Sequence, residues 1–205
     1  MGFGLALLVT QKLKTSNTLK TIFFMPNLIG GLILGFIWQF VFQEVFAGVG
    51  KVIGSKGLMG WLSTEKTGFW GLVILMSWQM AGYLMIVYIS GIQNISTEVI
   101  EAAKIDGASA WQRLRTIIFP LVRPAMTISI FLTLSNSFKL YDQNLSLTAG
   151  GPGNATQMIS MNILKTGQKF NEMGQAQAKA IVLLLVVGVI SLIQVYLSKR
   201  GEVEA

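Results

Sequence analysis

The chain has 205 residues, of which 52% are hydrophobic and 12% charged, whereas about a quarter of the residues of a typical soluble domain are charged. Lys and Arg number 16 against 9 Asp and Glu, and because the aromatic residues lie within apolar runs, this excess indicates membrane orientation and argues against nucleic acid as a partner. Cys and His are absent, which excludes disulfides, thiol nucleophiles, imidazole bases and the usual zinc ligands, so we expect no catalytic residue and no metal site.

The first residues form a short apolar segment, Gly2–Val9, which is only about half the length of a membrane span. Positive charge follows this segment, whereas a secretory signal has its positive charge before the apolar run. We therefore expect a partial span, in a chain that begins within a transmembrane helix. A short helix on the membrane surface is the alternative.

Four longer apolar stretches can cross a hydrocarbon core of about 30 Å at a helical rise of about 1.5 Å per residue. They are Thr21–Phe42, Phe69–Ile92, Leu121–Leu140 and Ala178–Leu197. The third is interrupted by Ser, Thr and Asn, which indicates a position inside a helical bundle. The predicted fold class is therefore an all-α, polytopic membrane protein, with a single domain over residues 1–205.

The distribution of basic residues predicts the orientation of this bundle. Lys12, Lys14 and Lys20 precede the first span, and Lys199 and Arg200 follow the last. Together with the basic residues in or beside the connection Gln93–Pro120, they outnumber those of the connections Gln43–Gly68 and Tyr141–Gln177. Cytoplasmic connections of membrane proteins have an excess of basic residues. We therefore expect both ends and the middle connection to be cytoplasmic.

The middle connection predicts a helix–turn–helix over residues 96–120. Ser96–Ile105 has helical composition, with Ser96 or Thr97 as its N-cap. Gly107 suits a left-handed turn, and a second helix over 108–118 is expected to be broken by Pro120. Taken alone, this segment is either a docking surface for another protein or an amphipathic loop that rests on lipid headgroups.

The same segment resembles the EAA loop of bacterial ABC importer permeases, in which Glu-Ala-Ala is followed at fixed spacing by Gly, Ile and Leu-Pro. The matching positions are Glu101, Ala102, Ala103, Gly107, Ile117 and Pro120. Phe119 stands where Leu is usual. The runs Phe23–Pro26, Ile105–Trp111 and Leu147–Thr156 resemble the carbohydrate-uptake branch of these permeases, the maltose and glycerol-phosphate type. The resemblance covers nearly all of the chain.

This resemblance implies the fold of a type I ABC importer transmembrane domain that lacks its first helix and part of the second. It implies a multi-pass permease subunit in the bacterial cytoplasmic membrane, which forms half of the translocation path of a binding-protein-dependent sugar importer. The implied partners are a second permease, two ATPase subunits, an extracellular solute-binding protein, the lipid bilayer and a sugar or oligosaccharide. The six matching EAA positions would form the ATPase-coupling surface, with a charge-assisted contact at Glu101 and a sharp turn at Gly107.

ATP and Mg²⁺ would bind to the ATPase subunits, and this chain is expected to bind no cofactor and to be no enzyme. A phosphate-binding loop needs Gly, four residues, and then Gly-Lys-Ser/Thr. The nearest match ends at Gly50-Lys51, with Val45 at the first Gly position and Val52 at the hydroxyl position.

Polar side chains recur at helical spacing in the second and third predicted spans, and such side chains can line a solute path or join helices. Resemblance to the maltose-type permeases implies solute contacts at Asn27, Gln79, Met85, Thr133, Asn136 and Ser137. Gly31 and Leu140 stand where the maltose permease has polar side chains, which argues against maltose itself.

Three other functions remain as alternatives. A secondary transporter would need intramembrane ionisable groups for a coupling ion, and the apolar stretches have none at mid-depth. A permease of a non-sugar ABC importer, and a non-transporting membrane scaffold or inactive fragment, are not distinguished by the residues alone.

Overall fold

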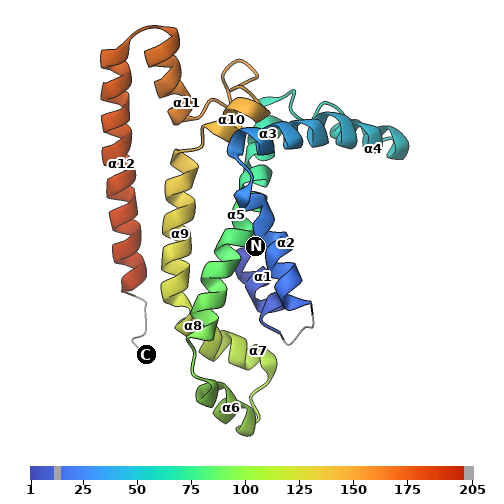
Figure 1. Ribbon diagram of the computed structural model, residues 1–205, viewed down its shortest axis with the longest axis vertical. Helices are drawn as coiled ribbons and strands as arrows, with labels where there is room; N and C mark the ends of the chain where they lie inside the picture. Colours follow the sequence, from blue (N-terminus) through green and yellow to red (C-terminus); the bar gives the residue numbers. More distant parts are fainter. Residues whose placement is uncertain (12–14, 201–205) are drawn as a thin grey trace. The chain divides into compact units, whose positions relative to one another are not determined.

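The computed structural model describes residues 1–11 and 15–200, and within these residues the regular structure is helical, with no strand (Figure 1). Lys12 and Lys14 lie outside the described residues. The α-helices are α1 (Gly2–Val9), α2 (Ser16–Leu28), α3 (Gly31–Phe40), α4 (Phe46–Ile53), α5 (Glu65–Gln93), α6 (Thr97–Ile105), α7 (Ala110–Arg113), α8 (Phe119–Leu121), α9 (Arg123–Phe138), α10 (Asp142–Leu147), α11 (Ile159–Leu164) and α12 (Met173–Lys199). The π-helical segments are η1 (Val41–Val45), η3 (Leu114–Ile118) and η4 (Lys165–Lys169), and η2 (Lys56–Leu58) is a 3₁₀-helix.

Three continuous helical runs are long and apolar enough to cross a membrane, namely Gly31–Ile53, Glu65–Gln93 and Met173–Lys199. A fourth is the pair Ala110–Leu121 and Arg123–Phe138, which is bent by 65° and counts only if both parts form one span. These lengths and compositions, together with the helical architecture, identify a membrane-embedded helical protein.

The first predicted span, Thr21–Phe42, is not one helix. Pro26 lies in the last turn of α2, which ends at Leu28, and Gly30 has the extended angles φ −58° and ψ 142° before α3 begins. Proline removes a helical hydrogen bond and glycine weakens the helix further, so the chain changes direction here. The helix then continues through η1 and α4 to Ile53, well into the predicted connection Gln43–Gly68.

The chain divides into two compact units. Unit 1 consists of Met1–Phe24, Ala81–Ser135 and the chain from Gly188, and unit 2 consists of Met25–Met80 and Asn136–Val187. The long helices α5, α9 and α12 pass from one unit into the other.

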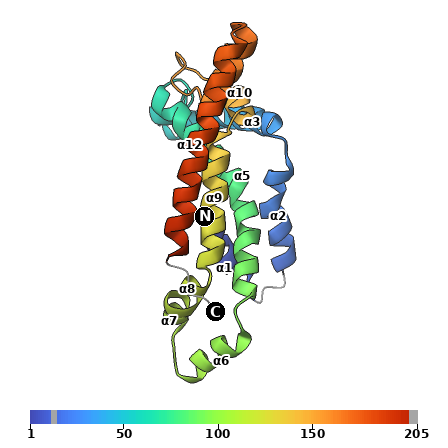
Figure 2. The same cartoon turned by 90° about the vertical axis from the view of Figure 1, so that its left-hand side faces the viewer.

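The core of unit 1 forms where α1 and α2 pack along the C-terminal half of α5 (Figure 2). Its buried side chains are Ala6, Val9, Met85 and Ile89. Gly82 permits the close approach of α2, since a Cβ atom at this position would lie 1.8 Å from the Phe23 carbonyl oxygen. The segment Gly2–Val9 is thus a packed helix within this unit.

The core of unit 2 forms around α3, α10 and the N-terminal half of α5. Its buried side chains are Leu34, Phe42, Leu72, Leu75, Leu140 and Leu147. The helix α10 lies directly against α3, where a Cβ atom on Gly35 would overlap the Ser146 Oγ atom. Within this unit the run α3–α4 crosses α5 rather than lying along it (Figure 1). The run Gly31–Ile53 is thus apolar enough for a membrane span, but it does not run parallel to α5 within this unit.

The segment that follows α10 is held by a buried polar side chain. Asn144 is fully buried, and its amide donates to the Thr148 hydroxyl (3.1 Å) and the Thr156 carbonyl (2.8 Å). The Asn144 Oδ1 atom accepts from the Met158 N–H at 3.0 Å. One side chain thus joins α10 to both ends of the loop 148–158, whose tip, residues 152–155, is exposed.

We expect Asn144→Leu to lower the free energy of unfolding by about 3 kcal/mol, because it removes the partners of one buried and one half-buried backbone group, and each unsatisfied group costs about 1–3 kcal/mol. A chain of this size should then melt about 6–12 °C lower. The measurement is a melting curve of the detergent-purified protein. Asn154→Gly is the control, since Asn154 is exposed at φ +67°, which glycine adopts freely. Equal melting temperatures for the two variants would contradict the role of Asn144.

Candidate functional site

The predicted helix–turn–helix is present as α6 and α7, and each helix has a side-chain N-cap. The Ser96 hydroxyl accepts from the Glu98 N–H at 3.2 Å and caps α6. Ser109 and Gln112 form a capping box at the start of α7, in which each side chain accepts from the other residue's N–H. These local bonds satisfy helix N–H groups that would otherwise lack partners.

The turn between the two helices depends on Gly107, which has φ +79°. The Ala108 N–H donates to the Ala103 carbonyl (2.9 Å), and the Gly107 N–H donates to the Lys104 carbonyl (3.1 Å). This pair of bonds is the Schellman arrangement that ends a helix in a left-handed residue. The predicted left-handed turn is therefore present.

Pro120 does not break the second helix, contrary to the expectation. The helix passes from α7 through η3 into α8, and the 65° bend comes after Leu121. In the π-helical turn the Phe119 N–H donates to the Leu114 carbonyl. Pro120 comes next and has no N–H, so the change from π to α hydrogen bonding occurs at a residue that needs no acceptor.

The α6–α7 hairpin exposes both charge and large apolar side chains. Ile105 is 86% and Trp111 68% exposed. Glu101 is exposed on α6 and, with Lys104 of the same helix, lines a cleft of about 670 Å³ that Ser16 and Lys20 of α2 also line. Contiguous exposed apolar side chains commonly mark an interaction site.

The other matching EAA residues support the hairpin's shape. Ala102 is exposed and Ala103 half-buried before the turn, and Ile117 and Pro120 are half-buried in η3 and α8. The small side chains leave the surface of α6 shallow. The structure thus places all six EAA positions on one continuous helical hairpin and its extension.

Four of the residues predicted to contact solute lie in unit 2. Asn136 is exposed and Asn27 half-buried, and Ser137 donates a long hydrogen bond to the Met76 Sδ atom at 3.7 Å. Gln79 accepts a hydrogen bond from the Gln143 amide at 2.8 Å and donates to the Ile29 carbonyl at 3.5 Å. These residues come from α2, α5 and the end of α9.

Gln143 is a further polar residue of this site, which was not predicted from the sequence. Besides its bond to Gln79, it fills the space beside Gly31, where a Cβ atom would lie 2.9 Å from the Gln143 Cδ atom. A polar side chain therefore lies beside Gly31, one of the two positions where the maltose permease has a polar side chain and this chain has none. The polar run Asp142-Gln143-Asn144, immediately after an apolar span, was the signal that could have indicated it.

The two remaining candidates lie in unit 1 and differ in environment. The half-buried Thr133 donates to the Ser129 carbonyl of its own helix at 2.8 Å, a common arrangement for threonine in membrane helices. Met85 is fully buried among Ala6, Val9 and Ile89. The helix α1 covers the face of α5 on which Met85 lies, and the contact of Met85 with solute stays a prediction.

A polar side chain of α12 joins that helix to the backbone of α9. Thr127 and Ser129 are buried, and the Gln194 amide of α12 donates to the Thr127 carbonyl at 3.4 Å and to the Ser198 hydroxyl at 3.0 Å. Amide and hydroxyl groups commonly hold membrane helices together. The polar residues near the start of α9 therefore pack within unit 1, as the sequence predicted for a span inside a bundle.

Comparison with known proteins places these features in one family. The family model described as "Binding-protein-dependent transport system inner membrane component" matches residues 1–202. The chain is 57% identical, over 204 residues, to the probable starch degradation products transport system permease protein AmyD of Thermoanaerobacterium thermosulfurigenes, with 100% of this chain and 70% of AmyD covered. It is 30% identical to the multiple sugar-binding transport system permease protein MsmF of Streptococcus mutans serotype c, with 99% of this chain and 70% of MsmF covered.

A solved structure shares the fold. It is the crystal structure of a bacterial alginate ABC transporter in complex with an alginate pentasaccharide-bound periplasmic protein. One of its chains matches with a TM-score of 0.85 and 22% identity, over 97% of this chain and 71% of that chain.

Proposed function

Because the chain belongs to the family of binding-protein-dependent transport system inner membrane components, we propose that it is a permease subunit of an ATP-driven importer of sugars or oligosaccharides. The observation that most directly supports the sugar assignment is the 57% identity, over the whole chain, to a permease named for starch degradation products. The second sugar-system relative supports the same solute class. This proposal replaces the alternatives of a non-sugar importer and of a scaffold without transport activity.

The proposed assembly contains a second permease, two ATPase subunits and an extracellular binding protein in the bacterial cytoplasmic membrane. ATP and Mg²⁺ bind to the ATPase subunits, and this chain supplies half of the path and the coupling surface. The binding protein is supported by the alginate transporter, which was solved with a periplasmic protein. The cytoplasmic position of the α6–α7 hairpin is supported by the excess of basic residues near it.

In this assembly the α6–α7 hairpin inserts into the ATPase and transmits its motion. The exposed Ile105 and Trp111 supply apolar contact area, and Glu101 supplies a charge at the rim of the adjoining cleft. Gly107 fixes the angle between the two helices. A capped hairpin joined without interruption to α8 moves as one body, which a coupling element requires.

The solute-contacting residues in the proposal are Asn27, Gln79, Thr133, Asn136 and Ser137, with Gln143 added. Amides and hydroxyls can pair with sugar hydroxyls. The bond between Gln143 and Gln79 fixes the direction of both amides. An ordered amide pair loses little side-chain entropy when it binds a ligand.

The proposed function is tested by reconstitution with the partner subunits in proteoliposomes. We expect ATP-dependent uptake of maltotriose, a starch-derived oligosaccharide, that requires the binding protein. Transport by an assembly made from this chain alone would contradict the proposed subunit composition. Uptake of an amino acid or phosphate, with no sugar uptake, would contradict the sugar assignment.

We expect Asn136→Ala to lower maltotriose uptake about five- to tenfold, because a net hydrogen bond is worth about 1–1.5 kcal/mol. Uptake of two competing sugars and a melting curve should be measured together. A contact with solute predicts a changed sugar preference at constant melting temperature, whereas a packing role predicts equal losses for both sugars and a lower melting temperature. Asn17→Ala, the same change at an exposed position at the start of α2, is the matched control.

A further inference from the structure

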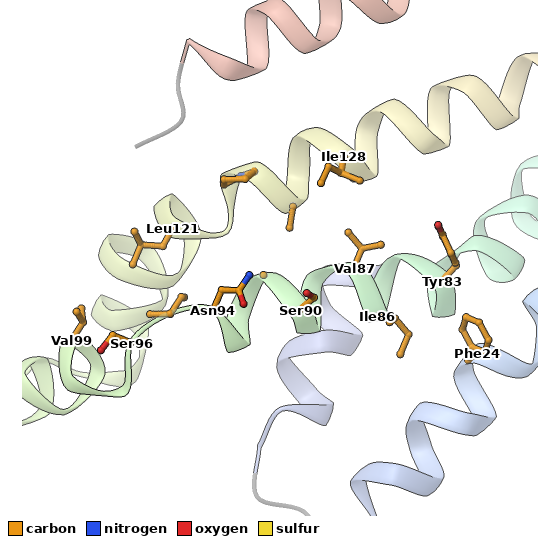
Figure 3. A pocket seen from close by; sticks show the side chains of 14 residues that line it. Phe24, Tyr83, Ile86, Val87, Ser90, Asn94, Ser96, Val99, Leu121 and Ile128 are labelled. Carbon is orange, nitrogen blue, oxygen red and sulfur yellow. The ribbon is translucent and has the colours of Figure 1, made fainter. Parts of the chain in front are cut away.

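A groove of about 1390 Å³ lies within unit 1, between the C-terminal half of α5 and the segment α8–α9 (Figure 3). Tyr83, Ser90 and Asn94 line it from α5, and Ile128 lines it from α9. Val99 lies at the end formed by α6. The groove thus reaches the coupling hairpin. Its volume exceeds the roughly 300–1,000 Å³ of typical small-ligand pockets, so it can hold an oligosaccharide.

The polar groups of α5 form one stripe along this groove. Ser90 comes seven residues and Asn94 eleven residues after Tyr83, which is close to two and three helical turns of about 3.6 residues. Figure 3 shows the three side chains on the side of α5 that faces α9. Ser90 and Asn94 are exposed and Tyr83 is half-buried. At a rise of about 1.5 Å per residue the stripe extends for about 16 Å, roughly half the thickness of the hydrocarbon core.

The chemistry of the lining matches an uncharged solute. Among the described residues that line the groove none is charged, and its polar groups are hydroxyls and amides. The aromatic side chains Phe24 and Tyr83 lie at one end, and an aromatic ring can contact the apolar C–H face of a sugar. An acidic saccharide would leave its carboxylates without a basic partner here, which is costly away from water.

We propose that this groove is the inner half of the solute path. In this proposal Tyr83, Ser90 and Asn94 guide a neutral oligosaccharide toward the cytoplasm after it leaves the solute-contacting residues named above. The proposal rests on the proposed importer function and adds to it the release route and the exclusion of acidic sugars. Weak, repeated contacts suit such a route, because a solute that binds tightly midway would not leave.

The first test measures access to the groove in the assembled importer, in inside-out vesicles. Since the chain has no cysteine, Ser90→Cys and Asn94→Cys can each be labelled with a charged, membrane-impermeant thiol reagent. Both thiols should react within about tenfold of the rate of Thr18→Cys, at an exposed position near the start of α2, since thiol reactivity depends on access. Leu184→Cys is the matched negative control, because Leu184 is 72% exposed on the apolar helix α12 and should face lipid.

Maltotriose should slow the labelling of Ser90→Cys, and an alginate trisaccharide should not. Failure of Ser90→Cys and Asn94→Cys to react in every nucleotide state, while Thr18→Cys reacts, would show that lipid or the second permease covers the groove and would overturn the proposal. Labelling with no protection by maltotriose, in an importer that transports maltotriose, would overturn the solute contact.

The second test measures uptake. Asn94→Leu should lower maltotriose uptake about five- to tenfold, whereas Asn17→Leu, the same change at an exposed position at the start of α2, should leave it unchanged. If the unmodified importer takes up maltotriose and both variants match it, the inner path is wrong and the proposed function stands. If the unmodified importer takes up no sugar, the proposed function itself fails.

Discussion

Gly82→Ala is expected to destabilise unit 1 strongly, although it adds a single methyl group. The added Cβ atom would lie 1.8 Å from the Phe23 carbonyl oxygen, 2.4 Å from its carbonyl carbon and 2.8 Å from the Phe24 Cα atom. These are backbone atoms of α2, which no rotamer change can move. Overpacking of a core typically costs about 1–3 kcal/mol, and a shift of two helices should cost at least the upper value. A melting temperature about 6–12 °C lower, or loss of the monodisperse protein in detergent, is the expected result.

Gly188→Ala is the matched control for this prediction. Gly188 lies in the long apolar helix α12, and a Cβ atom there would have no other atom within 4 Å. Alanine favours a helix interior over glycine by about 1 kcal/mol, so this variant should melt at the wild-type temperature or slightly higher. Similar melting curves for the two variants would show that α2 does not pack closely against α5.

Glu101→Lys is expected to lower maltotriose uptake by roughly two orders of magnitude while the complex still assembles. Reversal of a charge that is paired across an interface removes one contact and leaves the opposing charge facing a like one. Glu101 is exposed on α6 and belongs to no core cluster of the described residues, so the fold should be unaffected. The diagnostic measurement is the rate of ATP hydrolysis, which should no longer rise when the solute-loaded binding protein is added. Glu98→Lys, the same change one turn earlier on α6, is the control and should retain most uptake.

The turn provides a second way to examine the same coupling surface. Gly107→Val should reduce uptake strongly, because a β-branched residue is strained at φ +79°. Gly107→Asn should retain most of it, because Asn adopts left-handed angles more readily. A Cβ atom at Gly107 has no neighbour within 4 Å, so steric contact does not complicate the comparison. Equal uptake by all three proteins would show that the geometry of the hairpin is unimportant for coupling.

Several features of this protein follow from the sequence alone, because local interactions or length decide them. The apolar runs that became α5 and α12 are long enough to cross a bilayer whatever surrounds them. The cap at Ser96 and the left-handed turn at Gly107 depend on neighbours within a few residues. The EAA spacing also lies within one segment, and it indicated the family that the comparison then showed.

Other features depended on the tertiary structure. A helix that is apolar on all sides does not reveal which face packs, so the sequence could not show that Met85 faces α1 while Tyr83 and Ser90 line a groove. The pairing of Gln143 with Gln79 joins residues far apart in the chain. The crossing of α3–α4 over α5, and the contact of Gly82 with Phe23, likewise arise from packing between elements, which no local pattern encodes.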